Sequence, residues 1–71
     1  MSGIEMQKGV KYRIKGFTDD EIASKLLILG FLPGSSILLL RKSLFSGALY
    51  FKINNNRIAL RKNEAKVITV V

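Results

Sequence analysis

Apolar and polar residues alternate near the start of this chain. Val10, Tyr12 and Ile14 are separated by a lysine or arginine at each intervening position. A period of two places these apolar side chains on one face, so the pattern predicts a half-buried strand. Further along, the apolar spacing changes to that of a short amphipathic helix. The helical positions are Ile22, Ala23, Leu26, Leu27 and Leu29.

The predicted helix has start and stop signals. Thr18 and Glu21 have the spacing of a capping box, in which the threonine caps the helix and the glutamate bonds back to it. Gly30 fits the left-handed position just past the helix end, where the next residue folds back onto the last turn. Pro33 and Gly34 follow as a turn. These five residues are therefore expected to have structural roles.

The second half of the chain predicts four more short strands. The first is almost continuously apolar, which favours a central position covered on both faces. Three consecutive asparagines indicate a hairpin tip, because asparagine tolerates a positive φ. The predicted strands span residues 37–42, 49–53, 57–60 and 66–71, with a loop at 43–48 and a tight turn at 61–65.

Five short strands with one helix after the first predict a mainly β fold, a small antiparallel β-barrel. Closure of the barrel would bury both edges of the sheet. All 71 residues are expected to form one domain. A domain of this size hides only about 60% of the surface of its unfolded chain, so the core is thin.

The composition removes much of the usual chemistry of active sites. The chain has no cysteine and no histidine, so it lacks thiolate ligands, the commonest metal ligand and the usual general base near neutral pH. Three of its five carboxylates are Asp19, Asp20 and Glu21. Successive helical positions point in different directions, so this cluster does not converge on an ion. We expect no catalytic residue, no metal and no cofactor, and hence not an enzyme.

The positive charge is concentrated in the second half. The net charge is +7, and residues 36–71 hold seven basic residues against Glu64 alone, a net of +6. Such a surface attracts nucleic acid, the anionic inner leaflet of a membrane or an acidic protein patch. Charge alone therefore leaves the partner open.

Residues 26–40 form a run of fifteen residues without charge. A helix that spans a membrane needs about 20 apolar residues, and this run is interrupted by glycine, proline and serine. No charged segment followed by an apolar run marks a secretory signal at the start. We therefore expect no transmembrane segment and a cytoplasmic location.

Two motifs resemble a known family. Residues 26–37, which read LLILGFLPGSSI, fit the signature LxxLGxxPGxxI of the ferrous iron transport protein A family. Residues 57–68 resemble its second signature, iaLRKxEAxxI, and residues 9–17 match its usual first strand. Either motif alone has a plain structural explanation, but both occur in order. The resemblance covers residues 8–71.

The resemblance implies an SH3-like barrel in the bacterial cytoplasm, related to the C-terminal domain of iron-dependent repressors. Without a helix-turn-helix segment, a free-standing repressor is not expected. The implied partner is ferrous iron transport protein B, a membrane permease with a cytosolic G-protein domain, which would bring the protein to the inner face of the membrane. The implied function is that of an accessory or regulatory protein of ferrous iron uptake, acting by protein–protein contact.

Large apolar side chains in predicted loops are the best candidates for that contact, because no periodic face explains them. The predicted contact residues are Leu26, Phe31, Leu32, Leu44 and Phe45, with Arg41, Lys42 and Arg61 steering the approach. The same loops would serve self-association. The alternative is a basic nucleic-acid-binding barrel, which is less favoured because aromatic residues are few and no typical RNA-binding strand occurs. No residue indicates whether GTP hydrolysis or transport would be activated or inhibited.

Overall fold

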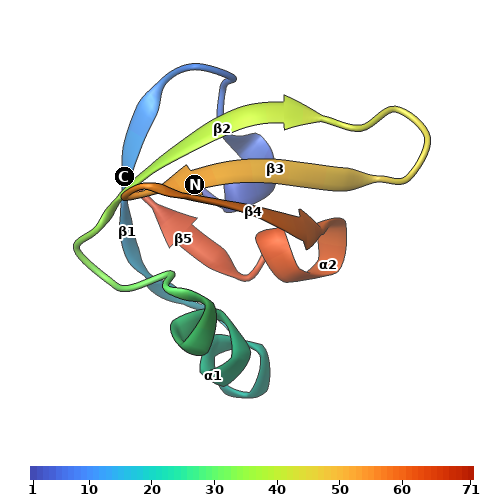
Figure 1. Ribbon diagram of the computed structural model, residues 1–71. Coiled ribbons are helices and arrows are strands. Elements are labelled where there is room, and N and C mark those ends of the chain that lie inside the picture. Colours follow the sequence, from blue (N-terminus) through green and yellow to red (C-terminus); the bar gives the residue numbers. More distant parts are fainter.

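The computed structural model describes residues 1–71 and contains five strands in one curved antiparallel sheet (Figure 1). The strand order is β4-β3-β2-β1-β5. The elements are the 3₁₀ helix η1 (Gly3–Glu5), β1 (Lys11–Phe17), α1 (Asp20–Leu29), β2 (Ser36–Lys42), β3 (Ala48–Ile53), β4 (Asn56–Arg61), α2 (Lys62–Ala65) and β5 (Ile68–Val70). The predicted mainly β fold, with one helix after the first strand, is confirmed.

Strand β1 is shared between two parts of the sheet. Residues 11–13 pair with β2, whereas residues 14–17 pair with β5, and the register shifts between Ile14 and Gly16. The sheet therefore bends at β1 and folds over its own core. Its edge strands β4 and β5 are not paired with each other, so the expected complete closure is wrong.

The N-terminal segment occupies the free edge of β5. The carbonyl of Met1 accepts a hydrogen bond of 2.7 Å from the N–H of Val70, and Ser2 forms a bridge with Thr69. Gly3 packs directly against α2, since a Cβ at this position would lie 2.4 Å from the carbonyl oxygen of Ala65. These contacts partly cover the edge of β5, which was expected to be covered by closure of the barrel.

The core is a single cluster of apolar side chains inside the curved sheet, and no polar side chain is buried. The rings of Phe31 and Phe51 meet edge to face, with centroids 6.1 Å apart. Strand β2 is central, as predicted, but only one face is fully covered: Leu38 and Leu40 stay half-buried. The cluster comprises Met6, Ile14, Leu26, Phe31, Ile37, Leu39, Leu49, Phe51, Ile53, Leu60, Ala65, Val67, Ile68 and Val70.

The start of α1 differs from the prediction by one residue. Asp19, not Thr18, is the N-cap, and its carboxylate accepts a 2.9 Å hydrogen bond from the N–H of Ile22. The N–H and hydroxyl of Thr18 both donate to the carbonyl of Val67, at 2.9 and 3.4 Å. The capping box of Thr18 and Glu21 is therefore wrong, because a contact with the end of the chain occupies the threonine. Glu21 is exposed in the first turn.

The end of α1 follows the prediction. Gly30 has a φ of +104°, and the N–H of Phe31 donates to the carbonyl of Leu26 at 2.9 Å, the six-to-one bond of a Schellman motif. In the turn that follows, Gly34 has a φ of +92° after Pro33. The N–H of Gly34 and the side chain of Arg13 tie this turn to β1. Gly30, Pro33 and Gly34 thus fix where the chain goes after the helix.

Candidate functional site

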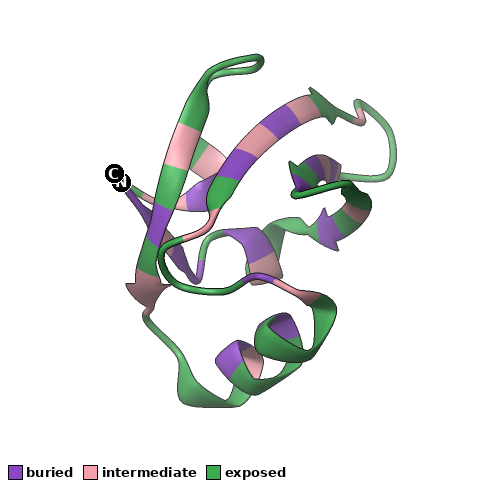
Figure 2. Ribbon diagram, turned by 60° about the vertical axis from the view of Figure 1, so that its left-hand side comes forward, coloured by how far each residue is buried: buried purple, intermediate pink, exposed green.

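Helix α1 buries only a narrow stripe of its surface (Figure 2). Leu26 lies on that stripe and is fully buried, and the Schellman motif turns Phe31 into the core beneath the helix, where it is also fully buried. Both residues were predicted to contact a partner from an exposed position, and the structure contradicts this for both. Leu26 and Phe31 hold the helix on the sheet instead.

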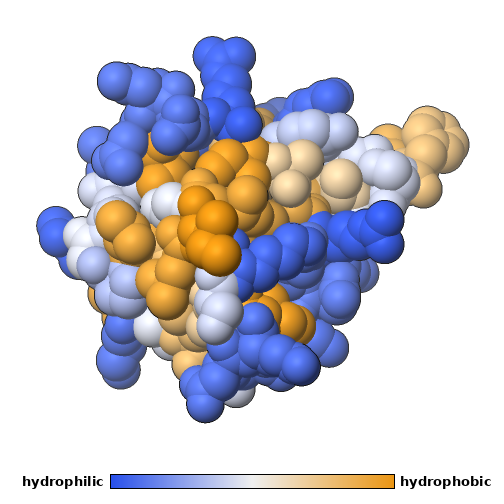
Figure 3. Space-filling view, turned by 60° about the horizontal axis from the view of Figure 1, so that its bottom comes forward, coloured by the Kyte–Doolittle hydropathy of each residue, from blue (hydrophilic) through white to orange (hydrophobic).

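The other side of α1 exposes a group of large apolar side chains, which we call the α1 surface. Ile28 is 87% exposed, and its neighbours are between about a third and a half exposed. Figure 3 shows apolar atoms gathered over this end of the molecule, with polar residues around them. The α1 surface consists of Leu27, Ile28, Leu29 and Leu32.

Of the α1 surface, only Leu32 was among the predicted contact residues. Leu27 and Leu29 were expected in the core, and Ile28 was assigned no role. One signal in the sequence pointed to them. Four consecutive apolar residues, 26–29, wrap around more of a helix than one buried stripe can cover, so some of them had to face solvent.

Polar contacts hold the α1 surface in place. Lys25 forms an ion pair with Glu64, which connects α1 to α2 across 39 positions of sequence. That bond, together with the backbone N–H of Arg61, holds the pKa of Glu64 below its usual value. Thr18, which directly precedes the N-cap of the helix, is bonded to Val67. The helix is therefore anchored to the second half of the chain on two sides.

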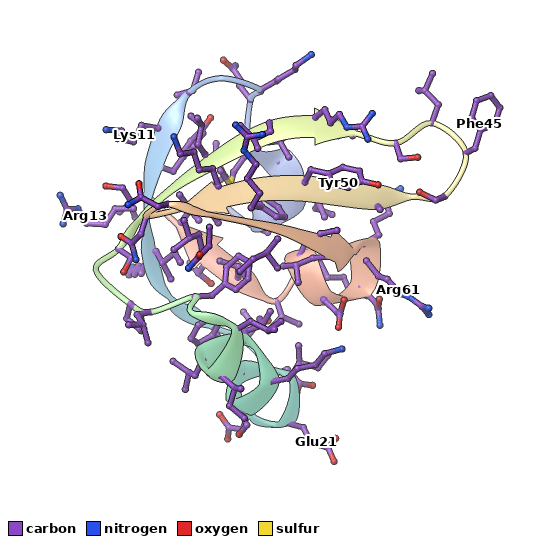
Figure 4. The ribbon with its side chains drawn as sticks, viewed as in Figure 1. Lys11, Arg13, Glu21, Phe45, Tyr50 and Arg61 are labelled. Carbon is purple, nitrogen blue, oxygen red and sulfur yellow. The ribbon has the colours of Figure 1, made fainter.

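A second exposed apolar group lies at the tip of the connection between β2 and β3. Leu44 and Phe45 are 91% and 100% exposed. Figure 4 shows Phe45 pointing away from the sheet. The hydroxyls of Ser43 and Ser46 accept hydrogen bonds from the backbone N–H groups of residues 46 and 48, at 3.2 and 3.3 Å. Polar side chains thus support the turn from within, while the apolar ones project into solvent.

Basic residues lie at the same end of the sheet as this tip. Arg41 stacks over the ring of Tyr50, with its guanidinium carbon 4.4 Å from the ring centroid. Arg61 pairs with Ala48, the first residue after the connection, and so lies at the same end of the sheet (Figure 4). Lys42 donates to the carbonyl of Ile4 at 3.4 Å. We call this group the loop-end surface: Arg41, Lys42, Leu44, Phe45, Tyr50 and Arg61.

The structure thus brings together five of the eight predicted contact residues, namely Leu44, Phe45, Arg41, Lys42 and Arg61. It places Leu32 elsewhere, on the α1 surface, and buries Leu26 and Phe31. No three carboxylates lie close enough together to hold a metal ion. Neither α-helix has the length and apolarity that crossing a bilayer requires. The structure thus exposes two separate groups of large apolar side chains, one on the α1 surface and one on the loop-end surface.

Comparison with known families gives a match along almost the entire chain. Residues 4–71 match the model of the FeoA domain. The chain belongs to the FeoA family. This agrees with the resemblance found in the two sequence motifs, and it adds residues 4–7 of the N-terminal segment. No curated protein sequence matches the chain.

Solved structures of FeoA proteins are similar in both sequence and fold. Iron(II) transport protein A from Clostridium thermocellum is 35% identical, with a TM-score of 0.88 over 99% of this chain. The present chain spans 44% of the length of that protein. FeoA from Stenotrophomonas maltophilia is 29% identical, with a TM-score of 0.85, and the match covers 100% of this chain and 89% of that one.

The Stenotrophomonas protein was solved with zinc and is described as a prokaryotic SH3 domain protein, with a suggested role as a ferrous iron transport activating factor. ScaR, solved with bound Cd²⁺, has a TM-score of 0.89 at 20% identity, covering 99% of this chain and 34% of that one. At that identity only the fold is shared. The SH3-like fold predicted from the sequence is confirmed by these neighbours.

Proposed function

We propose that this FeoA-family protein is a cytosolic accessory protein of bacterial ferrous iron uptake, and that it acts without catalysis. Its partner in this proposal is the ferrous iron permease, ferrous iron transport protein B, through the cytosolic G-protein domain. Membership of the FeoA family supports a role in ferrous iron uptake. The suggested activating role of the Stenotrophomonas relative supports an accessory function rather than transport itself.

The observation that carries a protein–protein function is the α1 surface. Three exposed apolar side chains lie on a helix whose position is fixed by packing and by the Lys25–Glu64 ion pair, and Leu32 follows just after the helix. Burying such side chains contributes roughly 25 cal/mol for each Å² of apolar area removed from water. Because the backbone of the helix is already ordered, binding requires the ordering of exposed side chains in this region but no further folding of the backbone.

The N-terminal end of α1 adds a polar border to this apolar surface. Asp20 and Glu21 are exposed in its first turn, whereas most of the remaining charge of the protein is positive. An apolar centre beside a charged border is the usual arrangement of a specific interface. The border would fix the orientation of the partner, and the apolar centre would supply most of the affinity.

The test is binding of the purified protein to the isolated cytosolic domain of its own organism's permease, with and without guanine nucleotide. We expect saturable binding that depends on the nucleotide, and at least about tenfold weaker binding for Ile28→Ser, as for a central interface residue. Phe45→Ser is the matched control, because it removes an equally exposed apolar side chain from the other surface. Absence of binding, or equal binding by Ile28→Ser and the wild type, would reject the proposal.

A further inference from the structure

We propose that the loop-end surface binds directly to a bilayer that contains anionic phospholipid. In this arrangement Leu44 and Phe45 enter the boundary between headgroups and acyl chains, and the surrounding cations contact the headgroups. This inference concerns a different surface from the one assigned to the permease. It can be tested independently of the proposed binding to the permease, because it needs no protein partner.

The shape of the tip carries the first part of the argument. Leu44 and Phe45 contribute nothing to the core, and both are almost completely exposed at the end of a protruding connection. The turn that presents them is held by two serine side chains and by a 2.8 Å bond from the N–H of Ser43 to the carbonyl of Ala48. A preformed protrusion with an apolar end suits insertion to a shallow depth, whereas a flat interface needs a broader apolar area.

The charge around the tip carries the second part. Arg41, Lys42 and Arg61 lie at the same end of the sheet as the tip, and Lys62 follows directly. The only ion pair in the fold joins Lys25 to Glu64, so none of these cations is paired with a carboxylate, although Lys42 donates to the carbonyl of Ile4. Each basic residue near an anionic headgroup surface adds to the affinity.

The cationic area continues from the tip along the outer face of the sheet. A shallow hollow there is lined by Leu40, Arg41, Tyr50 and Arg57. Its two guanidinium groups present several N–H donors beside a phenol hydroxyl, a combination that suits a phosphate oxygen. In this proposal the hollow takes a headgroup phosphate.

Nucleic acid is a poorer match for the same surface. Proteins that bind single strands stack bases on exposed aromatic faces. One face of the Tyr50 ring is covered by the guanidinium of Arg41, and Phe45 stands alone at the tip without a second ring beside it. An acidic protein surface would explain the cations, but it would leave a protruding apolar pair without a complementary environment. A lipid surface accommodates both features.

The absence of tryptophan from the chain allows a direct test. Phe45→Trp places a single tryptophan, which can be excited selectively over the two tyrosines, at the tip, and Ile28→Trp places one on the α1 surface as the matched control. Each variant is mixed with vesicles of pure phosphatidylcholine, or with vesicles of equal parts phosphatidylcholine and phosphatidylglycerol. We expect a blue shift of emission only for Phe45→Trp, and only with the anionic vesicles.

A second pair of variants tests the role of charge. Arg61→Glu removes a cation beside the tip, and Lys15→Glu makes the same change of net charge on β1, where residues 14–17 pair with β5 away from the β2–β3 connection. In vesicle sedimentation, Arg61→Glu should weaken binding at least about fivefold. Lys15→Glu should bind nearly as the wild type does. Circular dichroism confirms that both variants are folded.

Three results would overturn the proposal. Emission of Phe45→Trp could stay unchanged with anionic vesicles, or could shift equally with pure phosphatidylcholine. It could also shift with an RNA pool and not with vesicles, which would assign the loop-end surface to nucleic acid. None of these results affects binding to the permease domain through the α1 surface, because the vesicles contain no protein.

Discussion

The α1 surface and the loop-end surface both expose large apolar side chains, but they relate to the fold in opposite ways. Ile28 lies on a helix that is fixed to the core by Leu26, two positions earlier. Phe45 lies at the tip of a connection that contains no core residue. The α1 surface is therefore the exposed side of a helix that also packs on the core, whereas the tip of the loop-end surface belongs to a connection that does not pack on the core.

Because of this difference, a substitution on α1 is more apt to change the stability of the fold together with the exposed surface than a substitution at the tip is. On α1, the buried Leu26 and the exposed Ile28 lie within one turn of the helix, so a substitution that disturbs the helix affects both the core and the exposed surface. At the tip, Leu44 and Phe45 lie outside the core, so we expect that substitutions there have little effect on the stability of the folded state. The predictions below test how sharp this separation is, beginning with the largest effect.

Leu26→Ala should lower the free energy of unfolding by about 2–5 kcal/mol, because it leaves a cavity beneath α1. Ile28→Ala, on the same helix but in solvent, should change it by no more than about 0.5 kcal/mol. Urea denaturation followed by circular dichroism measures both. Similar values for the two variants would contradict the assignment of Leu26 to the core and Ile28 to the surface.

Gly3→Ala should lower the free energy of unfolding by about 1–3 kcal/mol, since the new methyl group would meet the carbonyl of Ala65 and displace the N-terminal segment. Gly16→Ala is the matched control: its Cβ would have no atom within 4 Å, and neither glycine has a positive φ. If both alanine variants unfold at the same urea concentration, the N-terminal segment does not pack on α2 as described.

Glu64→Gln should lower the free energy of unfolding near neutral pH by up to about 1 kcal/mol, the range for an exposed or partly exposed ion pair. The pKa of Glu64 is lowered in the folded state from a usual value of 4.5. Its contribution is therefore fully present above about pH 4.5 and is lost as the pH falls through the lowered pKa.

Chemical denaturation of Glu64→Gln and wild type at a series of pH values measures this contribution as a difference. The gap between the two proteins should close toward acid pH. A gap that is independent of pH would mean that Glu64 acts through packing and not through its charge.

Phe45→Ser should leave the free energy of unfolding within about 0.5 kcal/mol of the wild type, because the side chain contacts no part of the core. The same urea denaturation measures it. A loss as large as that of Leu26→Ala would show that the tip packs against the protein, which would remove the distinction between the two regions.

The parts of the fold that were predictable are those in which local chemistry and tertiary structure agree. Gly30, Pro33 and Gly34 fixed the end of α1 and the turn after it, because a left-handed glycine and a proline leave few conformations. The grouping of Leu44 and Phe45 with Arg41 and Lys42 followed from proximity along the chain. Arg61 joined them through the register of β3 and β4.

The errors arose where two solutions were locally equivalent. Thr18 and Asp19 are both good N-caps, and a bond from Thr18 to Val67, 49 residues away, decided between them. Residues 1–3 contain one large apolar residue and no periodic pattern, so the place of this segment beside β5 had no local signal. Which of the four apolar residues of α1 would be buried was likewise open, because the orientation of the helix is set by the sheet beneath it.

The sequence by itself determined the number and order of the strands, the helix after the first strand, the family, the absence of histidine and cysteine chemistry, and the excess of positive charge. These properties depend on residue types and on short-range spacing. The tertiary structure alone decided that Leu26 and Phe31 are core residues, that Ile28 is exposed, and that the N-terminal segment completes the edge of the sheet. Burial depends on how distant segments meet, and such long-range packing is not encoded in any single stretch of the chain.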